Sequence, residues 1–182
     1  CMKHVGLNVA ADPLFTLSYT GVNAGMVLCV ADDPAMHSSQ NEQDSRHYAV
    51  AAKLPMLEPV DSADAIAFAR AAFDLSERFD TVVMMRTCTR IAHSQSIVEL
   101  GERITPPEKL YAKNPEKYIM MPAYAKKRHP IVEQRMADLT KYAEKCPFNR
   151  VEPGTRTDLG IITSGTCYQY VKEVFGDTVP VL

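Results

Sequence analysis

Two short apolar runs, each followed at once by a polar stretch, constrain the fold of this chain more than any other feature. The first run covers residues 25–30 (GMVLCV) and the second covers residues 81–85 (TVVMM). Continuous apolar runs of this length are typical of strands buried in a parallel sheet. We therefore predict two parallel strands in the core of one sheet.

The residues between these runs predict a long helix. Asp61 is a suitable N-cap, and the alanine-rich stretch that follows it extends to about Phe79. The inner face of this helix would consist of Ala65, Phe68, Ala69, Ala72 and Phe73. A strand, a helix and a second strand form a βαβ unit, whose crossover is right-handed in nearly all proteins. The expected fold class is therefore α/β, with a parallel sheet flanked by helices.

The polar stretches behind the two strands indicate where a functional site would lie. Residues 31–48 (ADDPAMHSSQNEQDSRHY) follow the first strand, and residues 86–94 (RTCTRIAHS) follow the second. Ligands of open α/β sheets bind outside the carboxyl ends of the strands. Because the strands are parallel, we expect both stretches to meet at one edge of the sheet and to form a site there.

Two further helices are expected in the first part of the chain. Apolar residues at helical spacing predict a helix over 7–19, which Pro13 would break or restart. A second, short helix is expected over 41–53, ending before Pro55. Together with the βαβ unit, these elements assign residues 1–100 to one domain.

The rest of the chain differs in composition from residues 1–100. Five prolines between residues 101 and 130 indicate a linker over 101–156, which contains one amphipathic helix at 131–146. The basic residues 126–129 (KKRH) are expected on a solvated helix face. A strand at 159–163 and a helix at 166–175 then indicate that residues 157–182 begin a second domain.

Charge and cysteine spacing exclude several classes of protein. The formal net charge of −2 gives no reason to expect nucleic acid as a partner. The five cysteines are well separated, so neither a local Cys-x-x-Cys metal site nor a disulfide scaffold is expected. Free cysteines favour a reducing, cytoplasmic setting. No apolar run is long enough to span a membrane.

Both ends of the chain suggest a fragment of a longer protein. Residue 1 is a cysteine rather than a methionine, and helical patterning begins within a few residues of it. The last residues, 179–182 (VPVL), are apolar with nothing after them to pack against. Unpaired strand edges and bare apolar faces tend to associate. We therefore expect self-association, or a retained upstream segment.

Histidines and acids in the polar stretches raise the question of a metal site. Their spacing is irregular, and no H-E-x-x-H pattern or histidine pair at i, i+4 is present. We therefore expect no metal site. A nucleophilic serine is not expected either, because residues 163–166 (TSGT) lack the first glycine of a G-x-S-x-G turn. The simpler interpretation of that turn is the N-terminus of a helix, whose backbone N–H groups could bind an anion. The residues considered as metal ligands are Asp32, Asp33, His37, Asp44, His47 and His93.

Arginines are the more informative residues of the polar stretches. A guanidinium group offers a planar fork that matches a carboxylate bidentately. Arg46 and Arg90 lie inside the two converging stretches and are candidates to bind an acidic substrate. Arg86 is expected only to end its strand.

Four parts of the sequence resemble the large subunits of indolepyruvate:ferredoxin oxidoreductases, members of the 2-oxoacid:ferredoxin oxidoreductase family. The longest begins MKHVGLNVAADPLFTLSYTG at residue 2 and extends through the polar stretch to residue 49. The others are LPMLEPVDSADA, MMRTCTRIAHSQS and, more weakly, DLGIITSGTCYQYVKEVFG. The resemblance covers about residues 2–100 closely, the linker loosely, and 157–176 moderately.

The resemblance implies a fold and a reaction. Residues 1–100 would be most of a thiamine-diphosphate pyrimidine-binding domain, truncated at its N-terminus, and 157–182 the first β-α unit of a transketolase-C-terminal-like domain. The parent enzyme would hold thiamine diphosphate with magnesium, and [4Fe-4S] clusters. It would oxidatively decarboxylate arylpyruvates, with ferredoxin as electron acceptor and coenzyme A as acyl acceptor, beside a smaller second subunit.

The same resemblance implies site residues. Lys3, His4 and Asn8 would line the cofactor cleft, whereas Arg46, Arg90 and His93 would face the substrate.

Several parts of that machinery are not in this sequence. The glutamate that activates the cofactor is expected upstream of Cys1, so no residue here is assigned a catalytic role. The G-D-G…N motif for magnesium and diphosphate is absent, as are ferredoxin-type cysteine runs. We therefore expect the isolated chain to be inactive and to bind neither thiamine diphosphate nor iron. Two alternatives stay open: a non-catalytic interaction module of the same fold, and a stand-alone metal-dependent hydrolase that uses the His/Asp stretch.

Overall fold

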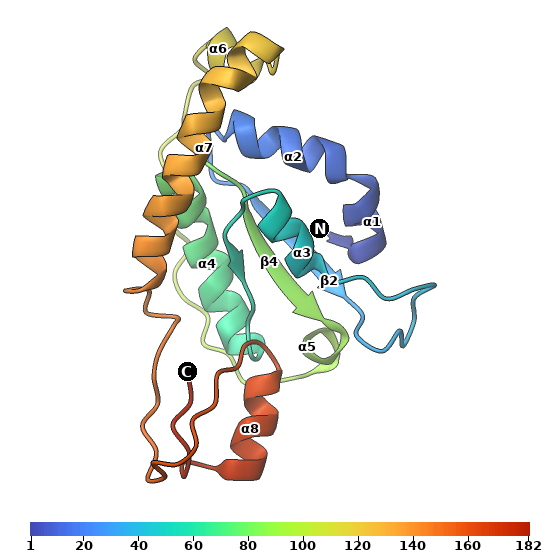
Figure 1. The fold of residues 1–182 in the computed structure, drawn as a ribbon, viewed down its shortest axis with the longest axis vertical. Coiled ribbons are helices and arrows are strands. Elements are labelled where there is room, and N and C mark those ends of the chain that lie inside the picture. Colours follow the sequence, from blue (N-terminus) through green and yellow to red (C-terminus); the bar gives the residue numbers. More distant parts are fainter.

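A computed structural model describes residues 1–182, and its centre is a sheet of four parallel strands (Figure 1). The strands are β1 (Met2–Lys3), β2 (Val27–Asp32), β3 (Met56–Leu57) and β4 (Val83–Cys88), in the spatial order β1-β2-β4-β3. The predicted α/β fold with a parallel sheet is therefore confirmed.

Helices cover both faces of the sheet. The first face carries α1 (His4–Val9), α2 (Ala11–Thr20) and α3 (Ser45–Ala51), which contribute to a core of nine buried residues that includes Leu7, Leu28, Ala49 and Met84. The second face carries α4 (Ser62–Phe79), whose Ala72 and Leu75 pack on Val83, with α7 (Pro122–Ala143) outside it (Figure 1). The other helices are α5 (Thr89–His93), α6 (Pro115–Tyr118) and α8 (Cys167–Phe175), and no helix is both long and apolar enough to cross a membrane.

The two central strands, β2 and β4, end together. They pair over six residues, from Val27 opposite Val83 to Asp32 opposite Cys88. Both strands begin two residues later than predicted and end two or three residues later, because the polar residues Asp32 and Arg86 still belong to the ladder. The predicted polar loop at 86–94 is accordingly the end of β4 followed by the short helix α5.

Helix α4 follows its prediction closely. The Asp61 side chain accepts a hydrogen bond from the backbone N–H of Asp64 at 2.9 Å, as an N-cap does. Asp80 ends the helix in the left-handed region, with φ 49°. The predicted inner face is wrong at one position: Phe73 is 51% exposed, and Leu75 and Ser76 are buried instead.

Two other helix predictions need correction. The helix expected over 7–19 is two helices that meet at Ala10, so Pro13 lies in the first turn of α2 rather than at its first residue. Helix α3 begins at Ser45 rather than at 41, because the Asp44 side chain caps it by accepting from the N–H of Arg46.

Helix α7 is longer than the sequence indicates. It begins at Pro122 instead of 131 and passes through Pro130 without ending. Arg128 and Arg135 are only 9% and 6% exposed, because their guanidinium groups donate to backbone carbonyls at the C-terminal end of α2 and to Asp80. The expectation of a solvated basic face is therefore wrong for Arg128. These contacts hold the supposed linker helix against the first domain.

The C-terminal segment also differs from its prediction. The expected strand at 159–163 is reduced to one isolated bridge, in which Ile161 pairs in parallel with Val181. Glu152 pairs with Val181 on the other side, so the end of the chain lies between these two stretches. Val179 and Val181 are consequently 1% and 2% exposed, and the apolar end is buried within its own segment.

Candidate functional site

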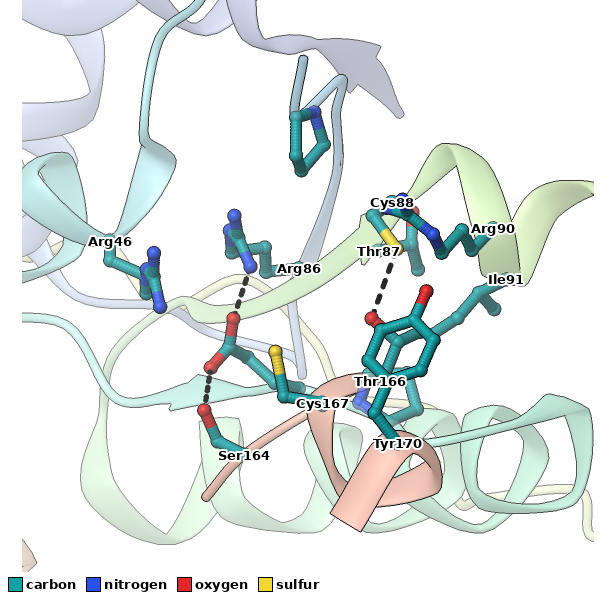
Figure 2. A pocket seen from close by; sticks show the side chains of 14 residues that line it. Arg46, Arg86, Thr87, Cys88, Arg90, Ile91, Ser164, Thr166, Cys167 and Tyr170 are labelled. Carbon is teal, nitrogen blue, oxygen red and sulfur yellow. Dashed lines mark hydrogen bonds and ion pairs between the residues drawn. The ribbon is translucent and has the colours of Figure 1, made fainter. Parts of the chain in front are cut away.

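A pocket of about 260 Å³ lies at the carboxyl edge of the sheet, where the sequence places a site (Figure 2). Its walls are the end of β4, the short helix α5, the residues after β3 and the start of α8. Three arginines line it: Arg46, Arg86 and Arg90. The two polar stretches thus meet as predicted, and the C-terminal segment adds a wall that the sequence analysis did not foresee.

Arg86 is the most embedded of the three arginines. Its Nε donates to Asp32 Oδ2 at 2.6 Å, and its Nη1 donates to Glu58 Oε1. Burial alone lowers the pKa of this guanidinium, but the hydrogen bonds and charges of Asp32 and Glu58 outweigh burial and raise it. Arg86 lies inside β4 and does not end it, so the sequence-based expectation for this residue is wrong.

Arg46 is tied to a neighbouring carboxylate. Its Nε and Nη2 donate to the two oxygens of Asp44, at 2.9 to 3.0 Å and 2.7 Å. The hydrogen bond from the Arg46 side chain lowers the pKa of Asp44 to about 2. Arg46 therefore lines the pocket as half of an ion pair.

Arg90 differs from both, because its guanidinium makes no ion pair and no hydrogen bond. Its nearest notable contact is the ring of Tyr170 in α8, with 5.8 Å between the guanidinium carbon and the ring centroid. His93, the third residue predicted to face the substrate, is exposed at the end of α5 and does not line the pocket. The structure thus brings Arg46 and Arg90 together and leaves His93 outside.

The start of α8 is held at the pocket by polar contacts. Ser164 Oγ donates to Glu58 Oε2 at 2.9 Å, so Glu58 contacts both Arg86 and the C-terminal segment. Thr166 Oγ1 lies 3.8 Å from the Sγ of the buried Cys88 (Figure 2). The Ser164-Gly165 turn was the available sequence signal, but it did not indicate which part of the fold it would face.

Asp33 organises the loop that follows β2. Its carboxylate accepts from Ser39 Oγ at 2.6 Å, from the N–H groups of Ser38 and His37, and from Thr89 Oγ1 at 2.8 Å. These hydrogen bonds hold the pKa of Asp33 well below its usual range. The loop is therefore fixed to α5 through a single carboxylate.

The residues predicted to line a cofactor cleft lie beside this loop. Lys3 Nζ donates to the carbonyl of Ser38 at 2.5 Å. His4 is fully buried, with Nε2 3.2 Å from the carbonyl of Asn41 and with Nδ1 lacking any hydrogen-bond partner. Asn8 is exposed on α1 and lies apart from them. Lys3 and His4 are thus brought to one place, and Asn8 is not.

The side chains of this chain do not form a site for magnesium and a diphosphate. Nowhere do three or more histidine, cysteine, aspartate or glutamate side chains gather in a way that could hold a metal ion. The carboxylates of Asp32 and Asp33 already accept hydrogen bonds from Ser45, Arg86 and the 37–39 loop. These side chains therefore do not fit the diphosphate and magnesium of thiamine diphosphate, and a hydrolase that uses this His/Asp stretch has no geometric support.

The fold and the position of the pocket indicate a class of protein domain. A parallel α/β sheet, with helices on both faces and a polar pocket at its carboxyl edge, is consistent with a thiamine-diphosphate pyrimidine-binding domain. No family model matches the chain.

Comparison with curated relatives indicates a more specific class than the fold does. It is 45% identical, over its whole length, to the indolepyruvate oxidoreductase subunit IorA of Methanothermobacter thermautotrophicus. Over 94% of its length it is 45% identical to the IorA subunit of Archaeoglobus fulgidus and 42% identical to that of Thermococcus kodakarensis. The chain belongs to the family of these IorA subunits over the region that it covers, and it spans about 30% of their length.

Proposed function

We propose that this chain forms part of a thiamine-diphosphate-dependent enzyme that oxidatively decarboxylates indolepyruvate or related arylpyruvates. The observation that carries the proposal is its similarity to indolepyruvate oxidoreductase subunits, which extends over the whole chain. Because the whole chain is aligned, the aligned region spans the positions that line the arginine pocket.

In this proposal the chain contributes walls of the active site and no complete cofactor site. Arg46 and Arg90 face the substrate, because a guanidinium suits the carboxylate of a 2-oxoacid. Lys3 and His4, against the loop after β2, would line the cofactor cleft. His93 and Asn8 are weaker candidates, since they are exposed away from these groups.

The remaining machinery would come from elsewhere. Thiamine diphosphate with magnesium, the activating glutamate and the [4Fe-4S] clusters would be held by the rest of the subunit and by a smaller second subunit. Ferredoxin would accept the electrons, and coenzyme A the acyl group.

The test uses the enzyme that contains this sequence, assayed with indolepyruvate, coenzyme A and an electron acceptor. Arg46→Ala and Arg90→Ala should each lower kcat/KM through the loss of a charge-assisted contact. Such a loss corresponds to roughly 2 to 4 kcal/mol, or about 30- to 1,000-fold. Arg103→Ala is the matched control, because Arg103 is exposed in the 94–114 segment and outside the pocket. Parental kcat/KM in both pocket variants, with unchanged cofactor affinity, would overturn the substrate-facing roles.

A further inference from the structure

Two cysteines line the arginine pocket from facing walls, and we propose that they form a redox-sensitive pair, which a low-molecular-weight disulfide converts into an internal disulfide bond. They are Cys88, the last residue of β4, and Cys167, the first residue of α8. Both are free thiols in the structure. Disulfides in reducing compartments are usually transient and redox-sensing rather than structural. The inference goes beyond the proposed function, because no step of it involves a 2-oxoacid or thiamine diphosphate.

The Cys88 thiol lies against the start of α8. Cys88 is only 6% exposed, and its Sγ lies 3.8 Å from Oγ1 of Thr166, the residue directly before Cys167. Figure 2 shows both sulfur atoms directed into the pocket, one from the β4 side and one from the α8 side. One thiol is thus in contact with the chain neighbour of the other.

A modest movement of α8 would close the bond. Because Cys88 faces Thr166 rather than Cys167, the helix has to turn until the Cβ atoms of the two cysteines lie roughly 3.5 to 4.5 Å apart. None of the residues of α8 is buried, so this turn uncovers no core. Gly165, just before the helix, has φ +57°, a conformation that glycine adopts without strain. The first turn of α8 can therefore rotate toward Cys88 while β4 stays in place.

The other three cysteines do not share the pocket. Cys1 precedes β1, Cys29 lies within β2 and Cys146 follows α7, and none of them lines the cavity. Accessibility then sets the order in which the pair reacts. Cys167 is exposed and can meet a soluble disulfide, whereas the buried Cys88 reacts only with a sulfur that is already in the pocket.

The exchange proceeds in two steps, written here for glutathione disulfide as the oxidant. The Cys167 thiolate attacks one sulfur of glutathione disulfide, so that its S–S bond breaks, a mixed disulfide forms and one glutathione leaves. The Cys88 thiolate then attacks the Cys167 sulfur, which forms the internal bond and releases the second glutathione. The two cysteine thiols lose two electrons and two protons, and the two glutathione molecules take them up. The bond fixes α8 to the sheet and couples the shape of the pocket to the thiol–disulfide balance of the surroundings.

The test is incubation of the full 182-residue chain with glutathione disulfide, followed by intact mass analysis and peptide mapping without reductant. We expect a mass lower by two hydrogen atoms and a peptide that joins Cys88 to Cys167, and dithiothreitol should reverse both. The oxidised chain should also unfold at a higher urea concentration than the reduced chain, because a cross-link that fits the fold constrains the unfolded state. A lasting glutathione adduct, another pairing, no reaction, or a lower urea midpoint would overturn the proposal.

Single replacements separate the roles of the two thiols. Cys88→Ser should stop at the glutathione adduct of Cys167, and Cys167→Ser should stay unmodified at Cys88. Cys29→Ser is the matched control, because Cys29 lies in the neighbouring strand and outside the pocket, and it should form the same disulfide as the parent chain. Loss of the disulfide in Cys29→Ser, or modification of Cys88 in Cys167→Ser, would also overturn the proposal. Because the readouts are mass and stability, failure here is distinct from failure of the proposed oxidoreductase activity.

Discussion

Replacing Arg86 by methionine would remove the centre of the charge network beneath the pocket. The Asp32 and Glu58 side chains are 1% and 11% exposed, and both point their oxygens at this guanidinium. Methionine fills similar space but offers no donor. The variant would therefore leave two nearly buried carboxylates that have lost their only ion-pair partner, since Ser45 and Ser164 supply the remaining hydrogen bonds.

The expected cost follows from that geometry. Removing one partner of a buried ion pair typically destabilises a protein by about 3 to 5 kcal/mol, because an uncompensated charge stays buried. For a chain of this size each kcal/mol shifts Tm by roughly 2 to 4 °C. We therefore expect Arg86→Met to lower Tm by about 10 °C, provided that unfolding is reversible.

The assay is urea unfolding of the 182-residue chain, followed by circular dichroism at several pH values. Burial without a counter-ion raises the pKa of a carboxyl group above its value in the unfolded chain. Such a group destabilises the folded state at neutral pH, and this penalty disappears once the group is protonated. The gap between the variant and the parent should therefore be widest near pH 7 and should narrow as the pH falls toward the usual range of carboxyl groups.

Arg103→Met is the control for the loss of one positive charge, and it should change stability by less than about 0.5 kcal/mol. A deficit below about 1 kcal/mol for Arg86→Met, or a deficit that does not depend on pH, would refute the reasoning. Either result would mean that solvent or rearrangement compensates these carboxylates.

Two further predictions concern single carboxylates. Asp61→Ala should lower the free energy of unfolding in urea by about 1 kcal/mol, because α4 loses its N-cap. Asp74→Ala, on the exposed face of that helix, should lower it little. Equal losses in the two variants would contradict the capping role. The lowered pKa of Asp33 stabilises the folded chain at a pH above 3.8, its usual value, and this contribution is lost as the pH falls below it. Asp33→Asn should thus be less stable than the parent at pH 7 and converge with it in acid, and an equal gap at every pH would exclude this linkage.

The central part of the fold was predictable because its signals are local. Two apolar runs and a capped alanine-rich helix specify β2, α4 and β4, and each signal lies within the element that it predicts. Strands β1 and β3 have two residues each, which is too short for any period to appear. The two edge strands, β1 and β3, were therefore not predicted, whereas the two central strands, β2 and β4, were predicted correctly.

Helix α7 shows where local rules fail. Proline disfavours a helix interior because it lacks an N–H donor and crowds the preceding turn. Arg128 and Arg135, on either side of Pro130, gain hydrogen bonds to carbonyls more than a hundred residues away in sequence. No pattern within the helix indicates those partners, so the sequence analysis began the helix only after Pro130 and placed Arg128 on a solvated face.

The pocket depends on contacts of the same non-local kind. Both polar stretches were predictable site elements, because a parallel sheet brings the ends of its strands together. The third wall comes from Ser164, which contacts Glu58 across 106 positions of sequence. Arg86 likewise owes its role to Asp32, 54 positions away. Of the three arginines, the one that sequence reasoning set aside is the most firmly bound, and only the structure distinguishes it from Arg90, which remains free to bind a ligand.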